Sequence, residues 1–465
     1  MGSSQQPLIY FSSLGLENVR CFGERRILEL TDEEGRLSQW TLLLGDNGVG
    51  KTTLLQCLAW MRPVPAFKEE DGKSDRKPDT IEPALISEEN RVLDSLLRTG
   101  TDVTLELNAT LSIGRRLGAK PNVQKIETGI RLVGKNGQLQ KSELTTNDFP
   151  AGLKNLALLD LPIFAYGAAR RMGIANLEKR EFFDPLASLF STETELRNAE
   201  QTLLDLDYLA LAAEKRHSRR YRKRLQKVKE LLATILPDVK DAEGIKIFGP
   251  QVLGKPEEPS GVKFETPYGI VPLSGLSLGY QTTLAWTLDL ATRLYERYPN
   301  SANPLAEPAI VLVDEIDLHL HPYWQRRIIA DLTQHFPKIQ FIATAHSPLM
   351  VQAATDANLA VLREQDGQAM IENRPYFVES WRVDQILTSE LFDLASARSP
   401  RIERLIAERN ALLDKLKRGS REEARLKELE HELENLPTAE HKDQEAMDLI
   451  RQAAELLKTQ EPRKR

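Results

Sequence analysis

Residues 40–53 read WTLLLGDNGVGKTT, and this stretch decides the fold. A short apolar strand over residues 40–44 leads directly into a glycine-rich turn, and the apolar-periodic segment LLQCLAWM that follows predicts a helix. The turn fits the pattern G-x4-G-K-[ST], in which glycines allow main-chain N–H groups to surround phosphate oxygens. A chance glycine turn is the alternative, but the strand and the helix stand in the order that a phosphate-binding loop requires. The stretch therefore predicts a nucleotide site.

Each residue of this loop has an expected task. The ammonium group of Lys51 is expected to reach the β and γ phosphates of ATP, and the hydroxyl of Thr52 is expected to ligate Mg²⁺. ATP and Mg²⁺ are thus the predicted cofactors. The predicted nucleotide-binding residues of the loop are Asn47, Gly48, Gly50, Lys51, Thr52 and Thr53.

The composition limits the class of protein. The chain has 465 residues, of which 41% are hydrophobic and 28% charged, so it has enough apolar material for one large core or two smaller ones. The net charge of −6 argues against a basic surface overall, so any nucleic-acid contact needs a local patch. The two cysteines, Cys21 and Cys57, indicate neither a disulfide framework nor a structural zinc site. Because no apolar run is long enough to span a membrane and the first residues lack a signal-peptide pattern, we expect a cytoplasmic protein without membrane contact.

A second chemical element is the apolar strand IVLV at residues 310–313, which ends in Asp314 and Glu315. The carboxyl ends of parallel strands are the usual place for a ligand site. Asp314 is expected to hold Mg²⁺ with Thr52, and Glu315 to orient and deprotonate the attacking water. The alternative is a strand that ends in solvated acids, which is disfavoured because the same chain carries a phosphate loop.

His346 ends the next predicted strand, in the segment FIATAHSP. An imidazole at this place can hydrogen-bond the γ-phosphate or the attacking water, although a single histidine is more often structural. His319 and His321 form an H-x-H pair beside carboxylates, which could suggest a metal site. We prefer to interpret this pair as a rigid turn packed near the nucleotide. The predicted catalytic residues are Glu315, His346 and Lys51.

The order of these motifs is specific. The segments LGDNGVGKTT, LSLGYQ, VLVDEIDLHLHP and TAHSP follow one another as in the ABC-type ATPase heads of the RecF, SMC and OLD-like families, which this chain resembles. In those families the signature loop of one subunit closes over the γ-phosphate bound to another. The resemblance therefore implies head dimers in which Ser277 and Gly279 of LSLGYQ act in trans, with a simple helix cap by Ser277 as the alternative. The chain departs from the pattern of those families in two places. Leu278 replaces a small residue of the signature, and no clear glutamine follows PIFAYG.

A narrower resemblance covers most of residues 14–395. NVRCFGERRILEL, FAYGAARR, GYQTTLAWTLDLATRLYERYP and WRVDQILTSELFDL are similar to the PtuA family, the ATPase subunits of Septu and of some retron anti-phage systems. This resemblance implies an oligomeric ATPase that holds and controls a separate HNH nuclease, a PtuB-like subunit. No acidic cluster like that of the OLD nucleases follows Ser347, so we expect the nuclease on another polypeptide.

The remaining patterns complete the predicted fold, an α/β P-loop ABC-type head with an antiparallel β lobe, a helical insertion and a C-terminal helical extension. Period-two alternation at 101–113 and 126–134 predicts the antiparallel strands, and leucines spaced by three and four residues after Arg401 predict docking helices. The predicted domains are an N-terminal head part at 1–187, an insertion at 188–244, a C-terminal head part at 245–395 and a helical docking region at 396–465.

One segment contrasts with the acidic chain. Residues 214–229 carry nine Lys or Arg in sixteen positions, a density that suits the phosphate backbone of DNA or of a retron nucleic acid. A solvated helix face or an acidic protein partner are the alternatives.

Two functions from different classes remain open. The preferred one is an ATP-hydrolysing regulatory subunit of an anti-phage defence complex. The alternative is a RecF/SMC-like ATPase that acts directly on DNA in repair or chromosome maintenance, for which the predicted insertion is far shorter than an SMC arm. A third, non-enzymatic interpretation makes ATP a structural ligand of an assembly.

Overall fold

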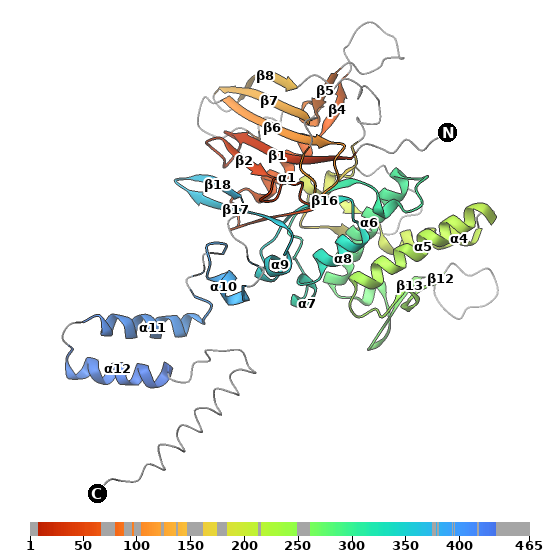
Figure 1. Cartoon of the computed structure of the whole chain (residues 1–465). Coiled ribbons are helices and arrows are strands. Elements are labelled where there is room, and N and C mark those ends of the chain that lie inside the picture. Colours follow the sequence, from red (N-terminus) through yellow and green to blue (C-terminus); the bar gives the residue numbers. More distant parts are fainter. Residues whose placement is uncertain are drawn as a thin grey trace. The chain divides into compact units, whose positions relative to one another are not determined.

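The computed structural model describes most of the chain, shown in Figure 1. Its residues fall into two compact units, Met1–Phe392 and Asp393–Arg465, and each unit is described by itself. The described residues are 8–66, 80–87, 95–96, 104–121, 125–135, 138–146, 161–173, 184–212, 215–248, 261–373, 378, 381–392, 394, 396–415 and 418–433. Among them, no helix is long and apolar enough to cross a membrane.

A six-stranded sheet forms the centre of the first unit, with the order β18-β17-β3-β16-β15-β9. All neighbours pair in parallel except β17 and β18. Strands β15 and β16 are wholly buried, as their mostly apolar sequences require, and Gln340 and Thr344 are the polar residues of β16. The strands are β3 (Trp40–Gly45), β9 (Ile163–Tyr166), β15 (Ala309–Val313), β16 (Ile339–Thr344), β17 (Asn358–Gln365) and β18 (Gln368–Asn373). The parallel sheet that the sequence predicts is confirmed.

The two faces of this sheet belong to different hydrophobic layers. Val311 and Phe341 face the layer that contains α6 (Leu278–Arg297) and α8 (Ile328–His335). Their neighbours Leu312 and Ile342 face the layer that contains α1 (Lys51–Trp60) and the β lobe. This division follows from the period of two along a strand. The sheet is therefore covered on both sides, and its carboxyl edge is left for ligands.

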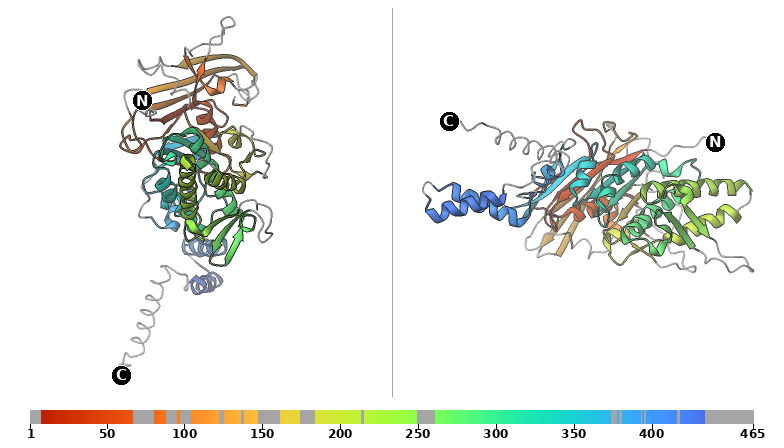
Figure 2. Two further views of the ribbon diagram at one scale, coloured as in Figure 1. Left: turned by 90° about the vertical axis from the view of Figure 1, so that its right-hand side faces the viewer. Right: turned by 90° about the horizontal axis from the view of Figure 1, so that it is seen from below.

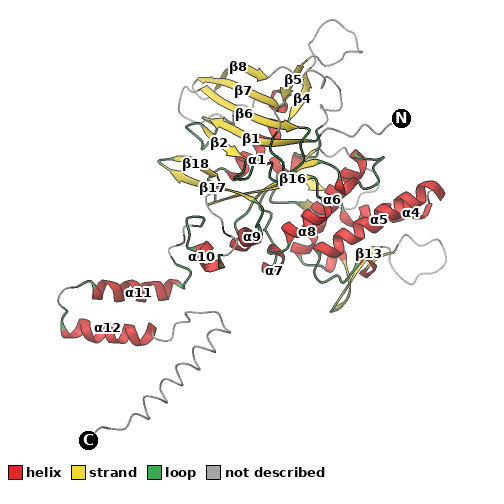
Figure 3. Ribbon diagram, viewed as in Figure 1, coloured by secondary structure: helices red, strands yellow, loops and turns green. Residues whose placement is uncertain are grey.

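The β lobe is a five-stranded antiparallel sheet with the order β2-β1-β6-β7-β8, drawn as yellow arrows in Figure 3. The side-chain amide of Gln340, at the start of β16, joins this lobe to the core. Its oxygen accepts from the main-chain N–H of Phe11 at 2.9 Å, and its nitrogen donates to the carbonyl of Phe11 at 2.8 Å. The strands are β1 (Ile9–Glu17), β2 (Arg26–Glu29), β6 (Thr104–Ile113), β7 (Lys125–Lys135) and β8 (Gln138–Thr146). The predicted antiparallel lobe is confirmed.

A helical hairpin of α4 (Ala199–Ala212) and α5 (Lys215–Ile235) packs beside α6, and Figure 2 shows the two helices side by side. Before it, α3 (Ala187–Phe190) contacts β9, and β11 (Glu195–Leu196) pairs with β10 (Arg171–Met172). After it comes a small antiparallel sheet of β12 (Ile245–Phe248), β13 (Gly261–Thr266) and β14 (Gly269–Pro272). A helical insertion is thus present, and β14 leads directly into the signature segment.

The second unit contains a pair of antiparallel helices, α11 (Pro400–Leu413) and α12 (Ser420–Leu433). Arg425 binds Glu408 through two hydrogen bonds of 2.8 and 3.0 Å, and Leu426 and Leu429 of α12 are buried. The predicted C-terminal helical extension is confirmed for these residues, whereas 434–465 lie outside the described part of the chain. The finer predicted division at 187/188, 244/245 and 395/396 stays a prediction.

Candidate nucleotide-binding and hydrolysis site

The phosphate loop lies between β3 and α1 and needs glycine at its two ends. Gly45 and Gly50 have φ of 134° and 98°, a region that L side chains rarely adopt. A Cβ at Gly45 would lie 2.2 Å from the carbonyl oxygen of Leu362, and one at Gly50 would lie 2.5 Å from the sulfur of Cys21. Both ends of the loop therefore require glycine, as in the glycine-rich loops that form anion cradles.

Lys51 begins α1 with its side chain buried under the loop. The ammonium group donates to the carbonyl oxygens of Gly45 at 2.7 Å and Asp46 at 2.6 Å. Burial lowers the pKa of Lys51, and the carboxylates of Asp314 and Glu315 oppose this shift. The ammonium group is thus held against the main chain of the predicted phosphate loop.

Thr52 and Asp314, the predicted metal ligands, are in contact. The Thr52 hydroxyl donates to Asp314 Oδ2 at 2.8 Å, and the Thr344 hydroxyl donates to Asp314 Oδ1 at 2.7 Å. Thr344 ends β16, and because β16 pairs with β15, its hydroxyl lies beside the residues that follow β15. Hydroxyl and carboxylate oxygens suit Mg²⁺, which keeps several waters and uses few protein ligands.

Glu315 follows Asp314 at the carboxyl edge and has a left-handed backbone, with φ of 49°. Its N–H donates to the Thr344 hydroxyl at 2.6 Å. The Glu315 side chain is half-buried. This position suits a carboxylate that orients a water molecule.

His346 lies at the same edge, two residues after Thr344. Its N–H donates to Asp317 Oδ2 at 2.9 Å, and its side chain is exposed. Asp317 is itself buried, so it fixes the main chain that presents the imidazole. The structure thus brings His346 to the strand ends that carry Asp314 and Glu315.

The H-x-H pair lies on the turn that follows these acids. His321 begins α7 (Pro322–Gln325), and its Nδ1 accepts from the N–H of Tyr323 at 3.3 Å. In the described part of the chain, no group of three or more His, Cys, Asp or Glu side chains gathers as a metal site would need. The geometry agrees with a rigid turn.

The signature residues lie at the start of α6. Ser277 is exposed and makes no capping hydrogen bond through its side chain, and Leu278 is 61% exposed. Gly279 packs on the turn after Glu315, since a Cβ there would lie 2.2 Å from the carbonyl oxygen of His319. The start of the helix therefore packs on the turn after Glu315 through Gly279, whereas Ser277 and Leu278 are exposed.

Two arginines near the loop have contacts that the motifs did not predict. Arg20 donates to the hydroxyl of Thr53 at 3.3 Å and to Gln56 at 2.7 Å, so the Thr53 side chain is engaged within the protein. Arg170, in the loop after β9, is 2% exposed and donates from Nη2 to the carbonyl oxygen of Glu315 at 2.6 Å. Burial lowers the pKa of Arg170 to about 10, against the attraction of nearby carboxylates. The segment FAYGAARR was the available signal for this residue.

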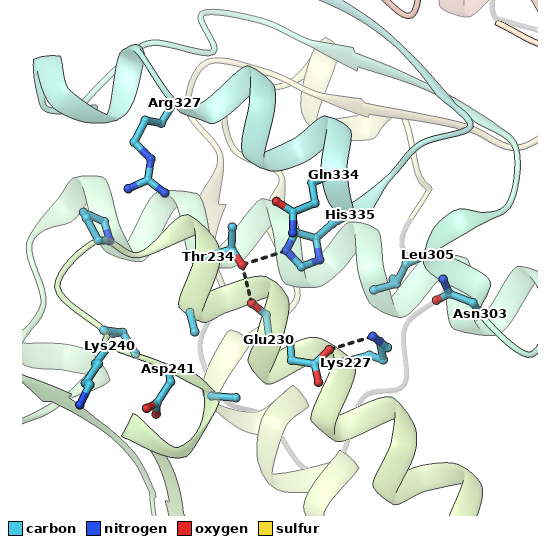
Figure 4. Close-up of a pocket in the computed structure, with 14 residues that line it drawn as sticks. Lys227, Glu230, Thr234, Lys240, Asp241, Asn303, Leu305, Arg327, Gln334 and His335 are labelled. Atoms are coloured by element: carbon cyan, nitrogen blue, oxygen red, sulfur yellow. Dashed lines mark hydrogen bonds and ion pairs between the residues drawn. The ribbon is translucent and has the colours of Figure 1, made fainter.

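A separate cavity of about 730 Å³ lies between α5 and α8 and is shown in Figure 4. Lys227 pairs with Glu230 at 2.8 Å, and His335 Nε2 lies 2.9 Å from the Thr234 hydroxyl. That hydroxyl donates to the carbonyl oxygen of Glu230, so it accepts from Nε2. These polar groups are paired with one another. Residues of the insertion and of the head line the cavity, and no phosphate-loop residue does.

A family described as "AAA domain, putative AbiEii toxin, Type IV TA system" matches residues 41–352. The chain belongs to this AAA-domain family. The match begins in β3 and ends in α9 (Pro348–Ala353), so it includes the phosphate loop, the Asp314–Glu315 pair and His346. By family, the chain is an ATPase of the P-loop class.

Individual relatives agree with the narrower resemblance. The Septu protein PtuA of Bacillus mycoides (strain KBAB4) is 36% identical over 162 residues, 35% of this chain and 22% of that protein. The Retron Ec83 probable ATPase of Escherichia coli is 50% identical over 88 residues, 19% of this chain and 16% of that protein. The match thus spans about a fifth of the length of these relatives. The predicted similarity to PtuA and retron ATPases is confirmed.

Solved structures similar to this AAA-domain chain include SMC heads. The SMC head domain from Thermotoga maritima superposes with a TM-score of 0.40 at 15% identity, over 78% of this chain and 98% of that one.

Proposed function

We propose that this chain binds and hydrolyses Mg²⁺–ATP, and that its nucleotide state controls a separate nuclease of a bacterial anti-phage complex. The observation that carries the first half is the continuous network Thr52–Asp314–Thr344–Glu315. It joins the helix after the phosphate loop to the main-chain N–H of Glu315, the predicted water-activating residue, through hydrogen bonds of 2.6 to 2.8 Å.

The chemistry follows from the charges at the carboxyl edge. Lys51 exchanges its loop carbonyls for β and γ phosphate oxygens, while the loop N–H groups hold the remaining ones. Thr52 and Asp314 are the residues that would hold Mg²⁺, which polarises phosphoryl oxygens when bound. Glu315 orients the attacking water and takes its proton, and His346 hydrogen-bonds the phosphate or the water.

A second subunit completes this site in the proposed mechanism. The exposed Ser277 hydroxyl, free of any cap bond, and the N–H groups at the start of α6 are available to a γ-phosphate on another copy. Ser277 and Gly279 would then act in trans in a head dimer. This arrangement makes hydrolysis depend on assembly.

The nuclease-control half rests on the similarity to PtuA and to retron ATPases. The α11–α12 pair presents mostly exposed charged side chains and is our candidate docking element for a PtuB-like HNH subunit. The cytoplasm is the proposed location, where such a complex meets phage nucleic acid.

The second candidate function is an ATPase that acts directly on DNA. Arg219 and Lys223 are exposed on α5, within the basic segment 214–229, of which Glu214 lies outside the described residues. This face suits a phosphate backbone of DNA or of a retron nucleic acid.

Co-expression with the neighbouring gene products distinguishes the two functions. The complex is purified with ATP and Mg²⁺, and its mass is compared between wild type and Glu315→Gln, which should trap ATP. An oligomer that retains a nuclease-like protein supports nuclease control. A chain that purifies alone and gains ATPase activity on addition of DNA contradicts it and supports the DNA-acting function.

A further inference from the structure

Arg170 is a buried cation at the catalytic edge to which none of the motifs gives a task. The strand before it, β9, pairs in parallel with β15, and the main-chain N–H of Asp314 donates to the carbonyl of Tyr166 at 2.8 Å. The loops that follow these two strands therefore leave the sheet side by side. This places Arg170 next to Glu315 although 145 residues separate them in sequence.

The peptide groups on both sides of Glu315 are held. Thr344 accepts from its N–H at 2.6 Å, and Arg170 donates to its carbonyl oxygen at 2.6 Å. Between these two bonds the backbone has a φ of 49°, which a non-glycine residue keeps only where its surroundings enforce it. The direction of the Glu315 side chain depends on this backbone.

We propose that Arg170 is a positioning residue that holds Glu315 in the orientation needed to activate water. The inference rests on the proposed ATP hydrolysis at the same site. Arg170 lies in the loop after β9 and Glu315 in the turn after β15, so the loop after β9 contributes to the reaction through this side chain.

The features of Arg170 itself fit a functional task better than a purely structural one. Its Nε is buried without a hydrogen-bond partner, and its own backbone is left-handed, with φ of 36°. Both features are unfavourable for the folded state. Asp314 and Asp317 supply the negative charge that keeps the guanidinium group in place. Lysine carries its charge on a flexible stem, so it holds this carbonyl less firmly than the planar guanidinium group does.

The test is a double-mutant cycle between Arg170 and Glu315, with steady-state ATP hydrolysis as the readout. Arg170→Ala should lower kcat by on the order of 10–100-fold while KM for ATP changes by less than about threefold, because Arg170 acts through Glu315. Arg170→Lys should not restore kcat, whereas added methylguanidinium should restore part of it in Arg170→Ala. In the Glu315→Gln background, Arg170→Ala should cause no further loss. Arg171, the exposed neighbour, gives the matched control Arg171→Ala with wild-type kcat.

Folding is checked by the affinity for a fluorescent ATP analogue, and Arg170→Gln replaces Arg170→Ala in the cycle if the alanine variant binds none. An unchanged kcat in Arg170→Ala, or a loss that adds fully to that of Glu315→Gln, overturns the inference. A wild-type chain that hydrolyses no ATP under any assembly condition overturns the proposed function as well, so the two failures are distinct.

Discussion

At the scale of single residues, the hydroxyl of Thr344 connects the two halves of the site. It donates to Asp314 Oδ1 and accepts from the N–H of Glu315, and both partners are on the adjacent strand end. A threonine at the end of a buried strand thus orients one carboxylate and anchors the backbone of the next.

We expect Thr344→Val to reduce both stability and turnover. The substitution keeps the shape of the side chain but leaves Asp314 Oδ1 and the Glu315 N–H without their partner, which costs about 1–3 kcal/mol of unfolding free energy. Urea unfolding and ATP hydrolysis measure the two effects. Thr344→Ser keeps the hydroxyl and serves as the control, so equal losses in the two variants would contradict the role assigned to the hydroxyl.

The local sequence predicts some of these residues and not others. Lys51, Thr52, Asp314 and Glu315 stand in motifs whose spacing carries their chemistry, and the structure places them together. Thr344 acts because β16 is inserted between β3 and β15, and this order of strands is not written in any local segment. Arg170 likewise depends on β9 pairing with β15, which brings together residues 145 positions apart in sequence.

At the scale of elements, α5 and α8 are joined at their carboxyl-terminal halves through Thr234 and His335. Burial and the neighbouring charge of Lys227 lower the pKa of His335 below its ordinary value of 6.5, while Glu230 opposes the shift. The neutral imidazole is therefore the form that is favoured at this contact between α5 and α8.

This shift predicts acid sensitivity with a definite sign. Above pH 6.5 the imidazole is neutral in both the folded and the unfolded chain, so the contact between α5 and α8 keeps its full stability. As the pH falls below 6.5, the unfolded chain takes up a proton before the folded one, and the unfolding free energy decreases. Urea unfolding at pH 7.5 and 5.5 should show a smaller decrease for His335→Gln than for wild type. The exposed His319 provides the control. If His319→Gln lowered the acid-induced loss of unfolding free energy as much as His335→Gln does, the assignment to His335 would be refuted.

The basic helix shows what a charge pattern leaves undetermined. The segment 214–229 predicts helix, and α5 spans Lys215–Ile235. Yet Arg222 donates to the carbonyl of Ala210, and Arg224 donates to the carbonyl of Pro299 and lies 5.0 Å from the ring centre of Tyr295. Arg222 therefore connects the two helices of the hairpin and Arg224 connects α5 to the region of α6, so tertiary packing decides which cations remain for a partner.

At the scale of the whole molecule, the proposed mechanism divides one active site between two copies. Lys51 of a subunit faces its own nucleotide, whereas Ser277 faces that of the next. Since α6 begins with an exposed serine that caps nothing, replacing its hydroxyl should leave the fold unchanged.

Subunit mixing tests this division. Lys51→Ala and Ser277→Ala should each be nearly inactive alone. In a mixed dimer, the intact loop of the Ser277→Ala subunit meets the intact signature of the Lys51→Ala subunit, so an equimolar mixture should regain about a quarter of wild-type activity. Thermal unfolding of Ser277→Ala should match wild type. A mixture as inactive as its components, or full activity of Ser277→Ala alone, would argue against shared sites.

The amide of Gln340 connects the core strand β16 to the β lobe. Gln340, near one end of this strand, is hydrogen-bonded to the backbone of β1. Thr344, at the other end, is hydrogen-bonded to Asp314. A buried strand of this length is a stiff rod of about 20 Å. A displacement of β16 at the Thr344 end would therefore move the β lobe as well, because the Gln340 amide holds the strand to β1.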